Sequence, residues 1–402
     1  MSKLHLNKNF LAGAIAAFAL TGTAQADLID GSNFFDNSQA QAYIGAGNGD
    51  NSLGKRDNLD RFVDANVPTS DFTGVVKLQM QIQGSYYTCT GTAISQRHIL
   101  SAAHCVDSNG QGTTMDISNG DQLLAIFNHD GDFNESPGNV IAAKNIAMHE
   151  NYNGFNVCAD GSAGCIGDDL AVIELTRDIP EGVEIYEIYD GFVSDTYSNS
   201  FGAGGDGALF TMVGYGTRGD GYTGFYTNGL TSDVSTQTED RLLGLASYTE
   251  KLVGYNIVDL VGFDDEGEDF AELWYADFDG TYTDHDGLFG DAGESYVVDR
   301  FCGFGICSTI LPENMEATIG GGDSGGPSFV WNALKGKYQI AATNTFGAPT
   351  SPIADGAFGH QFGGILLDPF KNWITAQIPA PATLMLFGLG LAGLASSRRK
   401  VK

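Results

Sequence analysis

The chain is poor in positive charge: it has 20 lysines and arginines against 50 aspartates and glutamates, for a formal net charge of −30. A field of that sign repels nucleic acid and anionic membrane surfaces, so no nucleic-acid partner is expected. Long hydrophobic runs are also scarce. The apolar run at Ala382–Ala395 has 14 residues, whereas a helix that spans a bilayer needs about 20.

Extended helical periodicity is scarce as well. Short runs rich in Val, Ile, Tyr and Phe recur between glycines instead, for example at Gly74–Gln83, Ala171–Leu175 and Leu209–Gly216. Glycine accounts for 55 of the 402 residues, about twice its usual share. This pattern predicts an all-β barrel or sandwich with elaborate loops.

The amino-terminal segment has the composition of a targeting sequence. Residues 1–26 contain two lysines, an apolar run from Phe10 to Leu20 and a final Ala-Gln-Ala. This arrangement predicts a secretory signal peptide that is cleaved after Ala26. Residues 27–61 are polar and rich in Asn, Gly and Asp, which is consistent with a propeptide or an N-terminal extension.

Cysteine is infrequent, with six residues in the chain. In an exported protein an even number of cysteines is most simply explained by disulfides. Proximity pairs Cys158 with Cys165 and Cys302 with Cys307, which leaves Cys89 with Cys105. No group of four ligands with tetrahedral spacing and neighbouring histidines is apparent, so no metal site is predicted from the cysteines.

Three short motifs carry residues that could act together in nucleophilic catalysis. LSAAHC, at Leu100–Cys105, places His104 after an expected strand, and DDLAVIEL places Asp169 directly before another. GGGDSGGP, at Gly320–Pro327, surrounds Ser324 with glycines. A histidine, an aspartate and a serine are the side chains that activate a hydroxyl nucleophile.

The motifs resemble the histidine box, aspartate strand and serine box of the trypsin-like (chymotrypsin-fold, S1) serine proteases. MVGYGT at Met212–Thr217 is similar to the strand that opens the second barrel, with Tyr215 where Trp is commoner, and FKNWI at Phe370–Ile374 is similar to the closing helix. The resemblance implies two antiparallel six-stranded Greek-key β-barrels with a short C-terminal helix. The protease domain would occupy residues 62–378, with a long insertion around 202–308.

The same resemblance implies a secreted serine endopeptidase that acts on polypeptide substrates through an acyl-enzyme. Ser324 would be the nucleophile, His104 the base and then the acid, and Asp169 the group that orients His104. The backbone amides of Gly322 and Ser324 would form the oxyanion hole. The neighbouring Asp168 is interpreted as a solvated loop residue. The other histidines considered are interpreted as surface or structural residues: His98, His129, His149, His285 and His360.

The implied substrate pocket has Thr318 at its floor, six residues before the nucleophile. Its walls would include Thr345, Phe346, Gly347 and Gly356. A family disulfide at the pocket is missing, because Gly320 stands at one of its cysteine positions. A neutral floor predicts a preference for neutral or apolar side chains.

Activation by cleavage after Arg61 would make the protein a zymogen, with Phe62-Val63-Asp64-Ala65 as the new N-terminus. Only Val63 fits the family's usual start. The family implies that such an N-terminus pairs with Asp323. The alternative is that other donors satisfy the Asp323 carboxylate.

No cofactor is predicted. Two acidic stretches, Asn128–Glu135 and Asp277–Asp291, could each be a calcium-binding loop or a solvated loop. Neither has the EF-hand spacing, which favours the solvated loop.

Residues 379–402 resemble a PEP-CTERM sorting tail, with Ala380 where that family usually has Glu. The tail implies export in a Gram-negative bacterium, to the periplasm, the cell surface or the medium, with attachment to a membrane or the cell surface as one outcome. Two other functions remain open: a catalytically silent trypsin-like binding protein and a surface-matrix protein.

Overall fold

The computed structural model describes residues 45–46, 70–128, 137–155, 157, 166–198, 207–216, 219–221, 224–225, 251–262, 271–283, 295–311, 315–348 and 356–379. The predicted signal peptide, most of residues 27–61, the Cys158–Cys165 pair and the tail from residue 380 lie outside them. Within the described part of the chain, no helix is long and apolar enough to cross a membrane.

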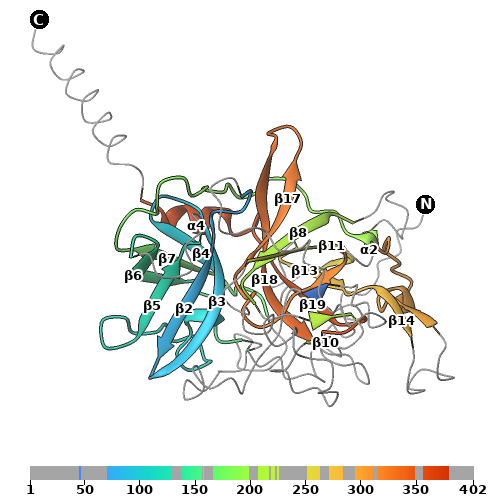
Figure 1. The fold of residues 1–402 in the computed structure, drawn as a ribbon, viewed down its shortest axis with the longest axis horizontal. Helices are drawn as coiled ribbons and strands as arrows, with labels where there is room; N and C mark the ends of the chain where they lie inside the picture. Colours follow the sequence, from blue (N-terminus) through green and yellow to red (C-terminus); the bar gives the residue numbers. More distant parts are fainter. Residues whose placement is uncertain are drawn as a thin grey trace, which may run out of the picture.

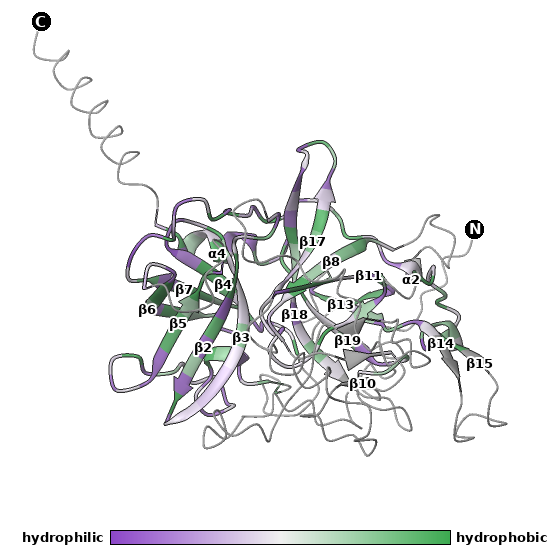
Figure 2. Ribbon diagram, in the orientation of Figure 1, coloured by the Kyte–Doolittle hydropathy of each residue, from purple (hydrophilic) through white to green (hydrophobic). Residues whose placement is uncertain are grey.

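The first half of the fold is a closed antiparallel barrel (Figure 1). Its strands in hydrogen-bonded order are β2 (Val75–Ile82), β3 (Ser85–Ala93), β4 (His98–Ser101), β7 (Ala171–Leu175), β6 (Val140–Met148) and β5 (Gln122–Ile126). Polar and apolar residues follow one another along these strands (Figure 2). The inward side chains include Leu78, Met80 and Ile173, all fully buried.

The second half is a curled antiparallel sheet of seven strands. Their order is β11 (Leu252–Ile257), β8 (Leu209–Gly214), β17 (Pro327–Asn332), β18 (Lys337–Ala348), β19 (Gln361–Leu366), β13 (Leu273–Asp277) and β12 (Leu260–Gly262). The all-β class is confirmed. This sheet has seven strands instead of six, and among the described residues its outer strands β11 and β12 do not pair with each other.

Smaller elements flank this sheet. A two-stranded ribbon joins β14 (Gly280–Thr283) and β15 (Ser295–Val298), and a four-stranded sheet has the order β10 (Gly224–Phe225), β9 (Gly219–Asp220), β1 (Gly45–Ala46) and β16 (Ala317–Thr318). The helices are short: η3 (His104–Val106), α2 (Thr196–Ser198), η6 (Cys302–Phe304) and α4 (Lys371–Gln377).

One apolar cluster joins the two halves. Leu100 and Val172 of the barrel share it with Tyr215 and Phe329 of the second sheet. Lys251 is buried beside this junction and donates a 2.5 Å hydrogen bond to the carbonyl oxygen of Phe72. Burial lowers the pKa of Lys251 to about 7. The strand ends that carry the three motifs therefore meet across a fixed interface.

Candidate active site

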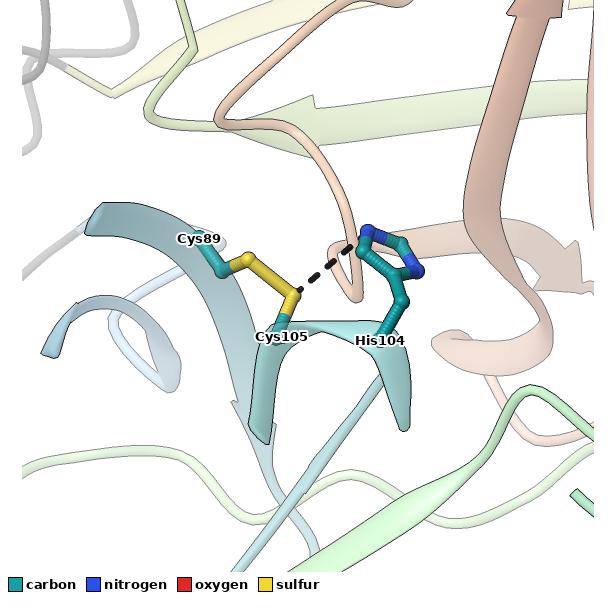
Figure 3. Close-up of side chains that lie close together, drawn as sticks. All are labelled: Cys89, His104 and Cys105. Carbon is teal, nitrogen blue, oxygen red and sulfur yellow. Dashed lines mark hydrogen bonds between the residues drawn. A yellow bond between two sulfur atoms is a disulfide. The ribbon is translucent and has the colours of Figure 1, made fainter. Parts of the chain in front are cut away.

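His104 begins the short helix η3, directly after strand β4. A disulfide between Cys89 of β3 and Cys105 fixes the backbone at this point (Figure 3). The ring nitrogen Nε2 of His104 lies 3.8 Å from the Cys105 sulfur. The disulfide thus holds the imidazole against the wall of the first barrel.

Asp169 lies beneath His104 and is almost fully buried. Its Oδ1 accepts the backbone N–H of His104 at 2.7 Å, and its Oδ2 lies 2.6 Å from His104 Nδ1. A carboxylate only accepts hydrogen bonds, so Nδ1 carries a proton and Nε2 of a neutral ring is left as an acceptor. This tautomer is the one that a general base at Nε2 requires.

Ser324 is half-buried in the loop between β16 and β17, and strand β3 of the first barrel holds that loop. The N–H of Thr90 donates to the Ser324 carbonyl oxygen at 2.9 Å, and the Thr90 hydroxyl donates to the Gly322 carbonyl oxygen at 2.8 Å. The Ser324 carbonyl oxygen also lies 3.7 Å from the Cys105 sulfur that contacts His104. The structure therefore places the backbone of Ser324 beside the pair formed by His104 and Asp169.

The glycines of the serine loop allow close approach to β3 and β4. A Cβ at Gly325, where φ is +76°, would lie 2.0 Å from Ser101 Oγ. Gly322 has φ of +95°, a conformation that glycine adopts without steric cost. Any side chain at Gly325 would push the loop away from the barrel that carries His104.

Only some of the backbone amides of this loop donate hydrogen bonds within the protein. The N–H groups of Asp323, Gly325 and Gly326 donate to carbonyl oxygens. Within the described residues, those of Gly322 and Ser324 donate to no protein group. Two unused donors on either side of one residue can bind a single oxyanion.

Asp323 is fully buried behind the loop, and its carboxylate accepts the N–H of Gly216 at 2.8 Å and of Gly320 at 3.3 Å. Burial raises the Asp323 pKa to about 8. The sequence left two alternatives for Asp323, a new N-terminal amine or other donors. The partners observed are other donors, the backbone N–H groups of Gly216 and Gly320. Phe62, the proposed new N-terminus, lies outside the described residues.

Two of the predicted pocket residues lie beside a buried histidine. Thr318 Oγ1 lies 2.9 Å from Nδ1 of His360, and a Cβ at Gly347 would lie 2.8 Å from the His360 ring. Of the other predicted pocket residues, Thr345 is buried and Phe346 is half-buried. Burial lowers the pKa of His360 to about 3. The sequence interpretation did not assign His360 to the pocket, although it stands two residues after the predicted wall segment Gly356–Phe358.

The interpretation of Asp168 as a solvated residue was wrong. Asp168 is buried, with φ of +60°, and its Oδ1 lies 2.7 Å from Nδ1 of His149. The His149 ring packs against Phe370 and Trp373 at helix α4. The two adjacent aspartates thus face two different histidines, and only Asp169 faces His104.

Comparison with known families gives two matches. The family model "Trypsin" matches residues 66–239, which include His104 and Asp169, and the PEP-CTERM protein-sorting motif matches residues 377–400. Chymotrypsin-like elastase family member 1 of Bos taurus is 31% identical over 112 residues, 28% of this chain and 36% of the relative. Trypsin Tyr p 3.0101 of Tyrophagus putrescentiae is 32% identical over 96 residues, 24% and 27% of the two chains.

The chain thus spans about a third of the length of the curated relatives it matches. Solved structures of similar shape include HL collagenase, with 16% identity, a TM-score of 0.42 and coverage of 80% of this chain and 100% of that one. Another is a Glu endopeptidase, with 12% identity, a TM-score of 0.41 and coverage of 79% and 94%. On its motif and family-model matches, the chain contains a trypsin-family domain and, after it, a PEP-CTERM protein-sorting motif.

Proposed function

We propose that the protein is an exported serine endopeptidase that uses His104, Asp169 and Ser324 as its catalytic triad. The observation that carries the proposal is the double contact of Asp169 with His104, beside the loop that presents Ser324. Two side chains of the required types are in contact there, and the backbone of Ser324, on a separate loop, lies beside them. A catalytically silent binding protein or a surface-matrix protein has no need of that arrangement.

In the proposed reaction, Ser324 Oγ attacks the carbonyl carbon of the scissile peptide while His104 Nε2 accepts the hydroxyl proton. The tetrahedral intermediate collapses when His104 returns that proton to the leaving amine, and an ester to Ser324 remains. Water then attacks the ester with His104 again as base, and the proton returns to Ser324 Oγ. Asp169 stays ionised and stabilises the imidazolium in both steps.

The negative charge on the carbonyl oxygen would be bound by the N–H groups of Gly322 and Ser324. Both amides are left without a protein acceptor in the described structure. Loss of one oxyanion donor typically lowers the rate by about 10²–10³. The reaction needs only these amides and three side chains, so no cofactor takes part in the proposed chemistry.

The pocket would favour neutral or apolar side chains before the scissile bond. Its floor contains Thr318 and His360, and with a pKa near 3 His360 is uncharged at neutral pH. A lysine or arginine side chain there would lose its hydration without gaining a carboxylate partner. Profiling cleavage of a mixed peptide library checks this, and a dominant preference for Lys or Arg would contradict it.

Ser324→Ala tests the catalytic proposal. We expect the purified variant to fold normally and to lose essentially all hydrolysis of a casein or ester substrate. Ser328→Ala is the matched control: Ser328 lies four residues along the same segment and its hydroxyl donates to Asn344. We expect that control to keep most activity. Full activity in Ser324→Ala, or equal loss in both variants, would contradict the proposal.

The sorting motif indicates an exported protein of Gram-negative bacteria. We further propose that residues 1–26 are the cleaved signal peptide, 27–61 a propeptide or extension, 62–378 the protease domain and 379–402 the sorting tail. N-terminal sequencing of protein recovered from culture would show the first cleavage site. Fractionation would show whether the tail keeps the protein on the cell surface.

A further inference from the structure

Four aspartates lie at or next to strand ends of the second half of the fold. Asp277 ends strand β13, Asp279 lies in the link before β14, and Asp299 directly follows β15. Each of these three offers an oxygen within 4.8 Å of the others. Asp259, between β11 and β12, adjoins them because its Oδ2 accepts the backbone N–H of Asp277 at 3.1 Å.

These carboxylates are anchored through one oxygen each. Asp277 Oδ2 accepts the N–H of Arg300, and Asp279 Oδ2 accepts the Ser308 hydroxyl at 3.1 Å. Asp299 Oδ1 accepts the N–H of Cys302 at 2.6 Å, beside the disulfide from Cys302 to Cys307. The protein therefore fixes the position of each carboxylate and leaves its second oxygen for another partner.

The second oxygens are buried and unsatisfied. Asp259, Asp277 and Asp279 are 0%, 0% and 2% exposed, and the Oδ1 atom of each has no hydrogen-bond partner. An ionised oxygen in that state costs several kcal/mol unless a positive charge faces it. Arg300 brings a positive charge to this place, but its Nε and Nη2 atoms make no hydrogen bond to these carboxylates.

Burial and mutual repulsion make the cluster resist ionisation. They raise the pKa of Asp279 to about 11 and the pKa of Asp259 well above its usual range, while burial raises that of Asp277 to about 6. Protons can neutralise part of the cluster, because an O–H of one carboxyl can be shared with an oxygen of its neighbour, as between Asp277 and Asp259 or Asp279. A cation instead can bind oxygens of Asp277, Asp279 and Asp299 at the same time, since these lie within 4.8 Å of one another.

We propose that Asp277, Asp279 and Asp299 bind a calcium ion, with Asp259 adjoining them. All of these donors are carboxylate oxygens, which hard cations prefer, and Ca²⁺ lies about 2.3–2.6 Å from its ligands. Two oxygens on opposite sides of the ion are then about 4.6–5.2 Å apart. The observed 4.8 Å limit on the separations among three of the aspartates suits that sphere. The site is separate from the triad and independent of the proposed proteolysis.

The proposed ion would also support the substrate pocket. The Asn256 side-chain amide donates to the carbonyl oxygens of both Asp277 and Ala317, each at 2.9 Å, and Ala317 precedes the floor residue Thr318. Phe278, between two of the ligands, donates its N–H to the carbonyl oxygen of His360. Calcium bound at Asp277, Asp279 and Asp299 would therefore fix the backbone behind the pocket floor.

Thermal unfolding of the full chain tests the site without using activity. Ser324→Ala serves as the background to prevent self-digestion. We expect 10 mM calcium to raise Tm by at least about 5 °C over EDTA, if the dissociation constant is near 0.1 mM. With Asp279→Asn added, the rise should disappear. Because an asparagine is uncharged without having to take up a proton on folding, Tm in EDTA should equal or exceed that of the background.

The matched control is Asp178→Asn, which changes an exposed aspartate of the first barrel and should keep the full calcium response. If Asp279→Asn does not fold, Asp277→Asn is the second variant. We expect it to lose the calcium-induced rise in Tm as well. An unchanged Tm in calcium would overturn the proposal. A rise of Tm in calcium that survives in the Asp279→Asn variant would also overturn it. If that rise disappeared in Asp130→Asn instead, the ion would be bound in Asn128–Glu135.

Discussion

The two halves of the fold differ in how their buried carboxylates are paired. In the first half, the buried Asp169 and Asp168 each face a histidine, and the ion pair between Arg97 and Asp178 lies at the surface. In the second half, Asp277 and Asp279 are buried and the Oδ1 atom of each has no hydrogen-bond partner. The second half therefore needs further donors or cations to satisfy its buried carboxylates, whereas the first half supplies partners of its own.

The difference matters because the proposed catalytic groups are divided between the halves. The rigid barrel carries His104 and Asp169, and the second half carries Ser324 and the pocket. Thr90 links them, since its hydroxyl donates to Gly322 and accepts the N–H of Tyr215. The mutual position of base and nucleophile therefore depends on a few hydrogen bonds across the junction.

The largest expected effect tests the division of roles between two adjacent aspartates. Asp169→Asn should lower kcat by about 10⁴, because the amide favours the wrong tautomer of His104. Asp168→Asn should change stability with little effect on kcat, since Asp168 faces His149. Steady-state kinetics with thermal unfolding separates the two, and a larger kcat loss in Asp168→Asn would reverse the assignment.

A smaller effect is expected at the link between the halves. Thr90→Val keeps the side-chain shape but removes the bond to Gly322 and leaves the buried Tyr215 N–H unpaired. We expect kcat to fall about tenfold with KM little changed, the equivalent of about 1.4 kcal/mol. Thr90→Ser retains the hydroxyl and should recover most of the rate. Equal losses in both variants would show that packing, not the hydrogen bond, positions the loop.

The pH dependence of stability sharpens the contrast in buried charge. An unfolded aspartate has a pKa near 3.9, whereas the pKa of Asp279 in the folded protein is raised to about 11. Between these two pH values the unfolded chain has lost this proton and the folded protein still holds it. The free energy of unfolding therefore falls as the pH rises through this range. Four charged groups add to desolvation in raising it: Asp277, Asp299, Asp259 and Glu316. In EDTA, Tm should therefore fall from pH 5 to pH 8.

The fall should be shallower in Asp279→Asn, since that variant lacks one of the raised groups. The pKa of Asp323 is raised as well, but Asp323 is present in both proteins, so its contribution to the pH dependence cancels in the comparison. Identical slopes would mean that Asp279 does not contribute to the pH dependence.

The smallest effect is expected at the exposed charges of the first barrel. The side chains of Arg97 and Asp178 are 50% and 60% exposed, and solvent screens such pairs. Arg97→Ala should therefore leave the Tm almost unchanged in thermal unfolding. A loss as large as that from a buried group would contradict the contrast between the halves.

The strand pattern predicted the all-β class, because short β-rich runs between glycines depend on local chemistry. The first barrel and the pairing of His104 with Asp169 were implied by the resemblance of the motifs to those of trypsin-like proteases, and the structure shows both. The pairing of Cys89 with Cys105, and of Cys302 with Cys307, followed from spacing and elimination.

What the sequence did not predict depends on contacts between distant segments. Asp168 looked like a loop residue because its partner His149 lies on another element, and His360 was not placed in the pocket for the same reason. For the acidic stretch at Asp277–Asp291 the sequence left open a calcium-binding loop and a solvated loop and favoured the solvated loop, yet Asp277 and Asp279 are buried. Their cluster includes Asp259 and Asp299, which no local spacing connects to them.

The central claim is that the second half supplies a nucleophile activated by the His–Asp pair of the first. Labelling the purified protein with a fluorophosphonate, followed by peptide mass spectrometry, tests this claim most directly. The account predicts one adduct per molecule, on Ser324, that is absent in Ser324→Ala and much slower to form in His104→Ala. Absence of labelling in a folded, mature protein, or an adduct on another serine, would contradict it.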